Sequence, residues 1–275
     1  MASAPTIELL DGQTLPVLGL GTWPLDDDEA YAAVGTALDG GYRLIDSAAR
    51  YDNELGVGQA VADSDVPREE IVVTTKLPGA QHGYEEALAG FEESRQRLGL
   101  EYVDLYLIHW PLPAIDRFVD TWRAFVQLRG QGLVRSIGVS NFTPRQIEQI
   151  VAATGVWPAV NQIELHPDFA QADVCAWHAE HGVTIESWRP LGRGLLGHPV
   201  LARIAEAHGK TPAQVVLRWH TQIGLVAIPK SGNPERIAQN IDVFDFELSD
   251  DELAALAEFD RDNRLGGDPD THVEL

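Results

Sequence analysis

The chain contains little cysteine and few basic residues, and it has no long hydrophobic run. Cys175 is the only cysteine among 275 residues, which excludes an internal disulfide and any zinc or iron–sulfur site built from several cysteines. No apolar run approaches the roughly 18 residues that a membrane helix needs, and residues 1–11 lack the basic and apolar layout of a signal peptide. These absences favour a cytoplasmic location and give no reason to expect a membrane partner.

The charge balance is strongly acidic. The chain has 42 acidic and 20 basic residues and a formal net charge of −22, which repels nucleic acid and anionic membranes at long range. We therefore expect no nucleic-acid partner, and a polyanionic ligand requires a local cluster of cations. The remaining composition, 44% hydrophobic and 23% charged, is that of a globular protein and excludes a disordered or low-complexity chain.

Short apolar segments alternate with longer amphipathic segments along the chain. The segments typical of buried strands are 18–21, 43–46, 71–76, 103–109, 134–140, 159–164, 184–188 and 225–228. The segments typical of helices are 30–38, 54–62, 84–98, 118–129, 144–152, 173–181, 199–208, 212–220 and 234–242. An alternating α/β chain of this length predicts a (β/α)8 TIM barrel that forms one domain over residues 1–275.

Two segments fall outside the barrel pattern. Residues 6–10 and 15–17 flank Asp11-Gly12, a strong turn signal that predicts an N-terminal β-hairpin at the bottom of the barrel. Ser249 precedes three acidic residues and predicts the start of a C-terminal helix, which leaves residues 264–275 as a polar tail.

Polar residues stand where the predicted strands end. They are Asp46, Lys76, His109, Ser140, Asn141, Gln162, Glu164, Trp188 and Lys230. One such residue is more often a hydrogen-bonded structural group than a functional one. A series of them, strand after strand, predicts a functional site, because barrels of this kind carry their active sites at the carboxyl ends of the strands.

Three of these residues, Asp46, Lys76 and His109, suit proton transfer to a carbonyl oxygen together with Tyr51. A lysine at the barrel mouth needs a partner, and Asp46 on the neighbouring strand predicts an ion pair with Lys76. Tyr51 follows in the next loop, where the ammonium is expected to lower the phenol pKa from about 10, and His109 can orient a substrate oxygen. Because this set has no electron source, we predict a nicotinamide hydride donor.

The segment 228–236 predicts NADPH rather than NADH. It places Lys230, Ser231 and Arg236 at a strand end and a helix start, where backbone N–H groups and the helix dipole favour phosphate. Charge-assisted hydrogen bonds from lysine and arginine suit a ribose 2′-phosphate. Asn240, one turn beyond Arg236, is positioned to face the adenine. Considered alone, a basic pair such as Lys230 and Arg236 lies on an exposed helix surface, without a ligand, about as often as it binds one.

The nicotinamide ring also has candidate partners. Trp188 ends the seventh strand with an aromatic face for stacking, and Ser140, Asn141 and Gln162 can hydrogen-bond the carboxamide. Core packing is the more frequent explanation for a single tryptophan at such a position.

Six motifs, taken together and in order, resemble those of the aldo-keto reductase superfamily. They are Leu44–Glu54, Thr75–Leu77, Leu107–Pro111, Gly138–Phe142, Asn161–Pro167 and Ile228–Ser231, and they extend over nearly the whole chain. The segments that are most similar to bacterial 2,5-diketo-D-gluconate reductases are Glu186–Trp188, Pro190–Gly192, Thr211–Gln214 and Asp242–Phe246. The loop 78–84 and the C-terminal tail, which shape the substrate pocket in this family, differ from those enzymes.

The resemblance implies a monomeric reductase with NADPH extended across the barrel mouth. Tyr51 is then the proton donor, and Asp46, Lys76 and His109 complete a catalytic tetrad. Further cofactor contacts are implied for Gly21, Thr22, Trp23, Pro190, Leu191, Gly192 and Gln239. The substrate pocket is expected to include Trp23, Leu77, Trp110 and Asn141, with Asn53 nearby. The expected reaction is reduction of aldehydes or ketones, such as small dicarbonyls or the keto sugar acid 2,5-diketo-D-gluconate.

Other interpretations are weaker. Gly192–Gly197 matches GxGxxG, but it follows the seventh strand, so we expect a loop over the pyrophosphate and not a Rossmann fold. His178 and His181 have no further ligand in a zinc-binding motif, so no metal site is predicted. A glycosidase using Glu164 and Asp46 leaves the lysine and the tyrosine without a role. A non-catalytic NADPH sensor remains the alternative, which only absent turnover distinguishes from an enzyme.

Overall fold

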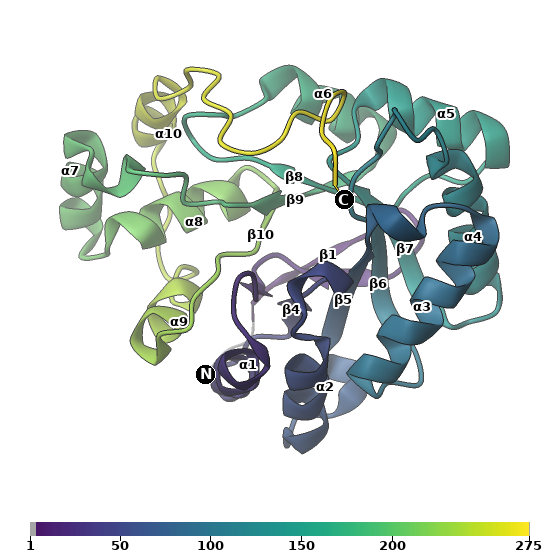
Figure 1. Cartoon of the computed structure of the whole chain (residues 1–275). Helices are drawn as coiled ribbons and strands as arrows, with labels where there is room; N and C mark the ends of the chain where they lie inside the picture. The colour runs from purple at the N-terminus through teal and green to yellow at the C-terminus, as the bar shows by residue number, and fades with distance from the viewer. Residues whose placement is uncertain (1–3, 275) are drawn as a thin grey trace.

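The computed structural model describes residues 4–274, which form the predicted barrel of parallel strands surrounded by helices (Figure 1). The strands, each paired in parallel with the next along the chain, are β3 (Leu20–Gly21), β4 (Leu44–Asp46), β5 (Val72–Leu77), β6 (Val103–Ile108), β7 (Val134–Ser140), β8 (Val160–Glu164), β9 (Thr184–Trp188) and β10 (Val226–Ala227). Residues 1–3 and 275, which belong to the predicted domain and tail, lie outside the described residues.

The first and last strands meet and close the barrel. The amide of Gly19 donates to the carbonyl of Ala227 (2.9 Å), and the amide of Ala227 donates to the carbonyl of Val17 (3.0 Å). A parallel bridge also joins Gly21 to Lys230, just beyond the ends of the regular strands. Closure pairs the two edges of the sheet with each other and fixes all the strand ends around one mouth.

The helices lie outside the strands. They are α1 (Asp27–Asp39), α2 (Glu54–Asp63), α3 (Tyr84–Leu98), α4 (Phe118–Gly130), α5 (Pro144–Thr154), α6 (Ala172–His181), α7 (Pro199–His208), α8 (Pro212–Gln222), α9 (Pro234–Ile241) and α10 (Asp250–Ala257). Thr143, Thr211, Asn233 and Ser249 each cap a predicted helix by accepting from the amide three residues on. Helix α1 starts earlier than predicted because Asp26 caps it.

The predicted N-terminal hairpin fills the lower end of the barrel. Strand β1 (Thr6–Glu8) pairs antiparallel with β2 (Thr14–Pro16), and Gly12 in the turn has a φ of 83°. Leu9 and Leu15 are buried in an interior cluster with Leu44, Leu105, Leu107, Ala159, Val160, Val226 and Ile228. This end of the barrel is therefore apolar and packed, which leaves the opposite end for a site.

Side chains of each strand alternate between the barrel interior and the layer under the helices. Ile45 and Val73 point outward into the large core cluster, whereas Leu44 belongs to the interior cluster. The next inward positions, towards the carboxyl ends, carry Asp46 on β4 and Lys76 on β5, which are both buried. The strand period therefore brings polar side chains together at the end of the barrel opposite the apolar interior cluster.

Two helical glycines provide a matched test of the packing. A Cβ on Gly58 of α2 would lie 2.0 Å from the backbone oxygen of Leu98, whereas a Cβ on Gly35 of α1 meets no atom within 4 Å. We expect Gly58→Ala to lower the free energy of unfolding by about 1–3 kcal/mol, since backbone must move. We expect Gly35→Ala to raise it by about 0.5–1 kcal/mol. Urea unfolding measures both, and equal effects would contradict the packing of α2 on α3.

Candidate active site

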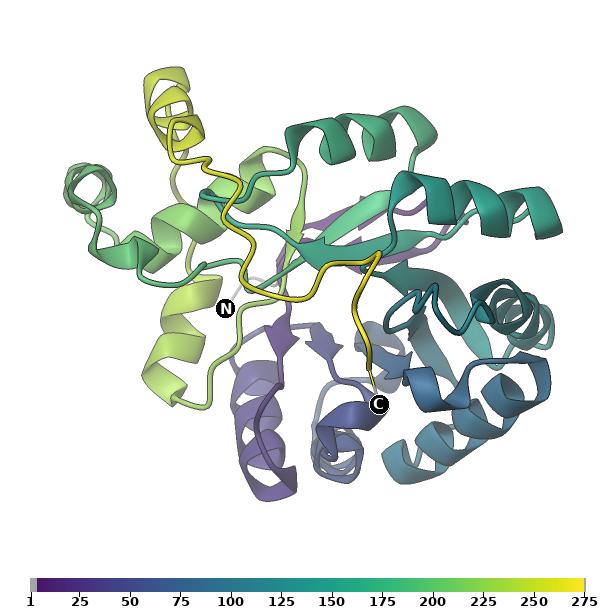
Figure 2. The ribbon, with the colours of Figure 1, turned by 45° about the horizontal axis from the view of Figure 1, so that its top comes forward.

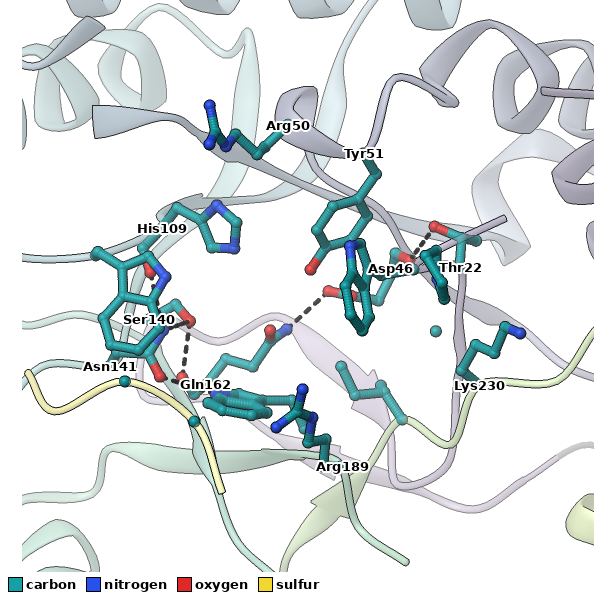
Figure 3. A pocket seen from close by; sticks show the side chains of 18 of the residues that line it. Thr22, Asp46, Arg50, Tyr51, His109, Ser140, Asn141, Gln162, Arg189 and Lys230 are labelled. Atoms are coloured by element: carbon teal, nitrogen blue, oxygen red, sulfur yellow. Dashed lines mark hydrogen bonds between the residues drawn. The ribbon is translucent and has the colours of Figure 1, made fainter. Parts of the chain in front are cut away.

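A cavity of about 540 Å³ opens at the carboxyl ends of the strands (Figure 3). The sequence-predicted site residues that line it are Gly21, Thr22, Trp23, Asp46, Tyr51, His109, Trp110, Ser140, Asn141, Gln162, Trp188, Pro190 and Lys230. The C-terminal tail crosses this mouth in Figure 2 and contributes Gly266, Gly267 and His272 to the lining. Arg50 and Arg189 are the lining cations that the sequence analysis did not assign to the site.

Lys76 and Asp46 form the predicted ion pair on neighbouring strands. The Nζ atom of Lys76 lies 2.8 Å from each carboxylate oxygen of Asp46 and donates to the carbonyl of Ser47 (2.7 Å). Burial works to lower the pKa of Lys76, but the charge of Asp46 prevails and raises the pKa above its ordinary value. Lys76 is therefore a fixed cation at the base of the cavity.

Tyr51 projects into the cavity from a short 3-10 helix, η1 (Ala49–Tyr51), that follows β4. Its hydroxyl lies 3.4 Å from Lys76 Nζ, and its ring meets the ring of His109 edge to face at 5.8 Å. The expected lowering of the Tyr51 pKa is wrong for this state of the protein. Burial raises the pKa more than the charge of Lys76 lowers it, and Asp46 adds to the increase. The phenol is therefore protonated at neutral pH.

A second buried carboxyl, Glu186 on β9, lies beside the ion pair. The amide Nε2 of Gln162 donates to Asp46 Oδ1 and to Glu186 Oε2, both at 2.7 Å. Burial and the charge of Asp46 raise the pKa of Glu186 to about 8, so this carboxyl is mostly neutral at pH 7. Because both amide hydrogens of Gln162 are engaged, its Oε1 is the atom that remains to accept a hydrogen bond from a ligand.

Asn141 holds Trp188 in a fixed orientation. It follows β7 in a left-handed conformation (φ 62°), which non-glycine residues seldom adopt outside constrained sites. Its Nδ2 donates to the carbonyl of His109 and to Ser140 Oγ, both at 3.0 Å, and its Oδ1 accepts from Trp188 Nε1 at 2.8 Å. The indole is half-buried and lines the cavity, which leaves one face for a planar ligand.

A second cavity of about 420 Å³ continues from the first. Its lining shares Arg189, Pro190 and Lys230 with the first cavity and adds the predicted cofactor residues Leu191 and Gly192. The two cavities together provide an extended groove from the barrel centre towards the basic segment at β10.

The remaining residues of the predicted phosphate site lie beyond this groove, on the segment before α9 and on α9 itself. Arg236 and Gln239 are exposed, whereas Ser231 and Asn240 are buried. The hydroxyl of Ser231 bonds the backbone of Asn233, which in turn caps the helix. Lys230 and Arg236 are exposed and form no ion pair with any of residues 4–274, whereas the hydroxyl of Ser231 already has a local partner.

Two residues expected at the substrate pocket are not there. Leu77 is fully buried, and its side chain lies next to Gly90 of α3, because it alternates outward from the inward-facing Lys76. Asn53 is also fully buried, and it bonds Ser47 Oγ and the carbonyl of Leu25. Both are structural, and Asn53 ties the loop before α2 to the loop after β3.

The sequence analysis missed Glu186, His272 and Glu274. Glu186 precedes Trp188 by two residues, so the strand period was a signal for its inward position. His272 stacks on Trp110 at 3.8 Å, and Glu274 pairs with His109. No sequence pattern places these tail residues, because their contacts join distant parts of the chain.

Neither a metal cluster nor a membrane helix is found in the part of the chain that the structure describes. Among residues 4–274, no group of three or more His, Cys, Asp or Glu side chains is placed to hold a metal ion. No helix in this range combines the length and the apolar character that crossing a membrane requires. His178 bonds Asn161 and the carbonyl of Val174 in the core.

Comparison with known proteins identifies the family. The sequence profile of the Aldo/keto reductase family matches residues 17–261. The chain is 50% identical to 2,5-diketo-D-gluconic acid reductase B of Corynebacterium over 100% of both chains, and 48% identical to methylglyoxal reductase DkgA of Escherichia coli over 98% of both. A crystal structure of a Gox0644 variant in complex with NADPH superposes with a TM-score of 0.95 at 48% identity, covering 98% of this chain and 99% of that one. The chain therefore belongs to the aldo/keto reductase family of oxidoreductases.

Proposed function

We propose that the protein reduces aldehyde or ketone carbonyls, with NADPH as the hydride source and Tyr51 as the proton donor. The observation that carries this proposal is the position of the Tyr51 hydroxyl, which lies 3.4 Å from Lys76 Nζ in a cavity shared with His109 and Trp188. Related proteins support the cofactor, because a structure at 48% identity holds NADPH. Bound NADPH supplies the hydride, and the residues of the chain supply the proton and the orientation.

The residues of the groove fit a dinucleotide phosphate. Trp188 offers an aromatic face, and Gln162 Oε1 and Ser140 Oγ are acceptors beside it that suit a carboxamide N–H. Leu191 and Gly192 extend the groove towards Lys230. Beyond it, the start of α9 presents Arg236 to a 2′-phosphate.

Proton delivery follows from the charges around Tyr51. Because burial raises its pKa, the phenol holds its proton at neutral pH and has one to give. The Lys76 ammonium lies close enough to stabilise the phenolate that forms after transfer. His109 faces the same space and orients the carbonyl oxygen towards the phenol.

The cavity suits small carbonyl substrates. Three tryptophans line it, Trp23, Trp110 and Trp188, and Trp23 is 52% exposed at the rim. Arg50 and Arg189 add positive charge at the same rim. Together with the two relatives named for methylglyoxal and diketogluconic acid, this lining supports small dicarbonyls and keto sugar acids as the substrate class.

A substrate panel tests the proposed reaction. We expect the loss of NADPH absorbance to report turnover with methylglyoxal, phenylglyoxal or 2,5-diketo-D-gluconate, and slower turnover with NADH. The ranking of kcat/KM among the panel distinguishes sugar acids from neutral dicarbonyls. Tight NADPH binding without turnover on any carbonyl would instead favour the non-catalytic sensor.

The variant Tyr51→Phe tests the proton donor. We expect kcat to fall by roughly 100-fold or more, since a positioned general acid typically contributes 10²–10⁴-fold. NADPH affinity, measured by quenching of tryptophan fluorescence, is expected to stay unchanged. The matched control is Tyr31→Phe, which removes an exposed hydroxyl bonded to Asp63. A near-normal kcat for Tyr51→Phe would refute its role.

The variant Arg236→Ala tests the 2′-phosphate site. We expect the Kd for NADPH to rise by roughly 10- to 100-fold, since a hydrogen bond to a charged group is worth about 1.5–3 kcal/mol. The Kd for NADH is expected to change little. The control is Arg203→Ala, another exposed arginine, on α7. Equal losses for the two cofactors would contradict a contact with the 2′-phosphate.

A further inference from the structure

The C-terminal tail places a carboxylate on the histidine of the active site. Glu274 Oε1 lies 2.8 Å from His109 Nδ1 in an ion-pair contact. The other oxygen, Oε2, accepts from the backbone amide of Gly79 at 2.8 Å. Only 7% of Glu274 is exposed, so both contacts are formed inside the protein. Each carboxylate oxygen thus has its own partner.

The tail is anchored before it reaches His109. The amides of Leu265 and Gly266 donate to the carboxylate of Glu164, both at 2.8 Å, and Gln146 donates to Asp270 at 3.2 Å. His272 then stacks on Trp110, the residue after His109. Successive contacts along the tail therefore lead Glu274 to one position.

The charge of Glu274 determines where His109 carries a proton. Burial opposes its ionisation, but the contact with His109 and the Gly79 amide prevail and hold the pKa of Glu274 below its ordinary value. An ionised carboxylate accepts hydrogen bonds and donates none. The 2.8 Å approach of Oε1 to Nδ1 lies outside hydrogen-bond geometry, but an ionised oxygen at this distance repels a bare ring nitrogen and so favours a proton on Nδ1.

We propose that Glu274 is a positioning residue that fixes a proton on Nδ1 of His109 and turns Nε2 towards the substrate oxygen. With Nδ1 protonated, a neutral ring has a bare Nε2, so His109 donates to a carbonyl only as the imidazolium. In that form the Glu274 carboxylate faces the protonated Nδ1, and a charged donor binds a developing alkoxide more strongly than a neutral one. This inference rests on the proposed carbonyl reduction and assigns the residue that prepares His109 for it.

Other groups also surround His109. The ring of Tyr51 meets it edge on, and His272 lies close enough that burial and the charge of His109 together lower the pKa of His272. Arg50 also lines the cavity, and its positive charge contributes to the lowered pKa of Glu274. Among these groups, Glu274 is the anion in contact with Nδ1.

The variant Glu274→Gln separates the charge from the shape of the side chain. A glutamine has one oxygen, and the Gly79 amide requires an acceptor. The amide NH₂ group is then left to face Nδ1 and to donate to it. We expect His109 to change from the Nδ1–H form to the neutral Nε2–H tautomer.

Nitrogen NMR of 15N-histidine protein measures this change, with the His109 signals assigned by their loss in His109→Gln. At alkaline pH we expect Nδ1–H in the wild-type protein and Nε2–H in Glu274→Gln. We expect kcat of this variant at neutral pH to fall about 10-fold, the difference between charged and neutral donors. The NADPH affinity of this variant is expected to stay unchanged.

Asp270→Asn is the control, because it alters a carboxylate of the same tail that has no contact with His109. We expect it to keep the wild-type tautomer and pH profile. An Nε2–H form in the wild type, the same His109 spectrum in Glu274→Gln, or equal effects of the two variants would overturn the proposal. Because the spectrum is recorded without substrate, absent turnover in the wild type would refute the proposed function and leave this test readable.

Discussion

The buried ion pair between Lys76 and Asp46 is the constraint on which the barrel mouth depends. Both side chains are almost fully buried, so the Lys76 cation relies on Asp46 and on the carbonyl of Ser47, and the Asp46 anion relies on Lys76 and on the amide of Gln162. Removing one partner of such a pair typically costs about 3–5 kcal/mol, because the other charge is left buried and alone. Barrel closure keeps the two charges together. Because both edges of the sheet are paired, β4 and β5 keep the register that places Asp46 beside Lys76.

The pair also sets the protonation of its neighbours. Burial and the charge of the adjacent Asp46 both oppose a second anion, and they raise the pKa of Glu186 to about 8. Gln162 bonds both carboxyls through one amide and so separates them at fixed distance. Burial raises the pKa of Tyr51, the charge of Lys76 lowers it and the charge of Asp46 raises it. Because burial has the largest effect, Tyr51 stays a phenol. Two acidic groups beside this ion pair, Glu186 and Tyr51, therefore hold their protons at pH 7.

Sequence patterns predicted the parts of the site that strand geometry fixes. Asp46, Lys76 and His109 end consecutive buried segments, and parallel strands bring such ends together. Leu77 failed as a pocket residue because the strand period of two turns it away from Lys76. The sign of the Tyr51 pKa shift failed for another reason, because it depends on the balance between burial and charge, which only the packed structure fixes.

The tail residues could not be predicted from sequence patterns, and they differ from the strand residues in how they are held. The groups of the proposed proton transfer lie on or next to strands, where closure makes their positions rigid. The pocket wall formed by Gly266, Gly267 and His272 comes instead from a segment held by hydrogen bonds to Glu164. Such a segment can vary in sequence without disturbing the barrel, so pocket shape changes independently of the chemistry. Glu274 joins the two parts, since it extends the tail to His109 itself.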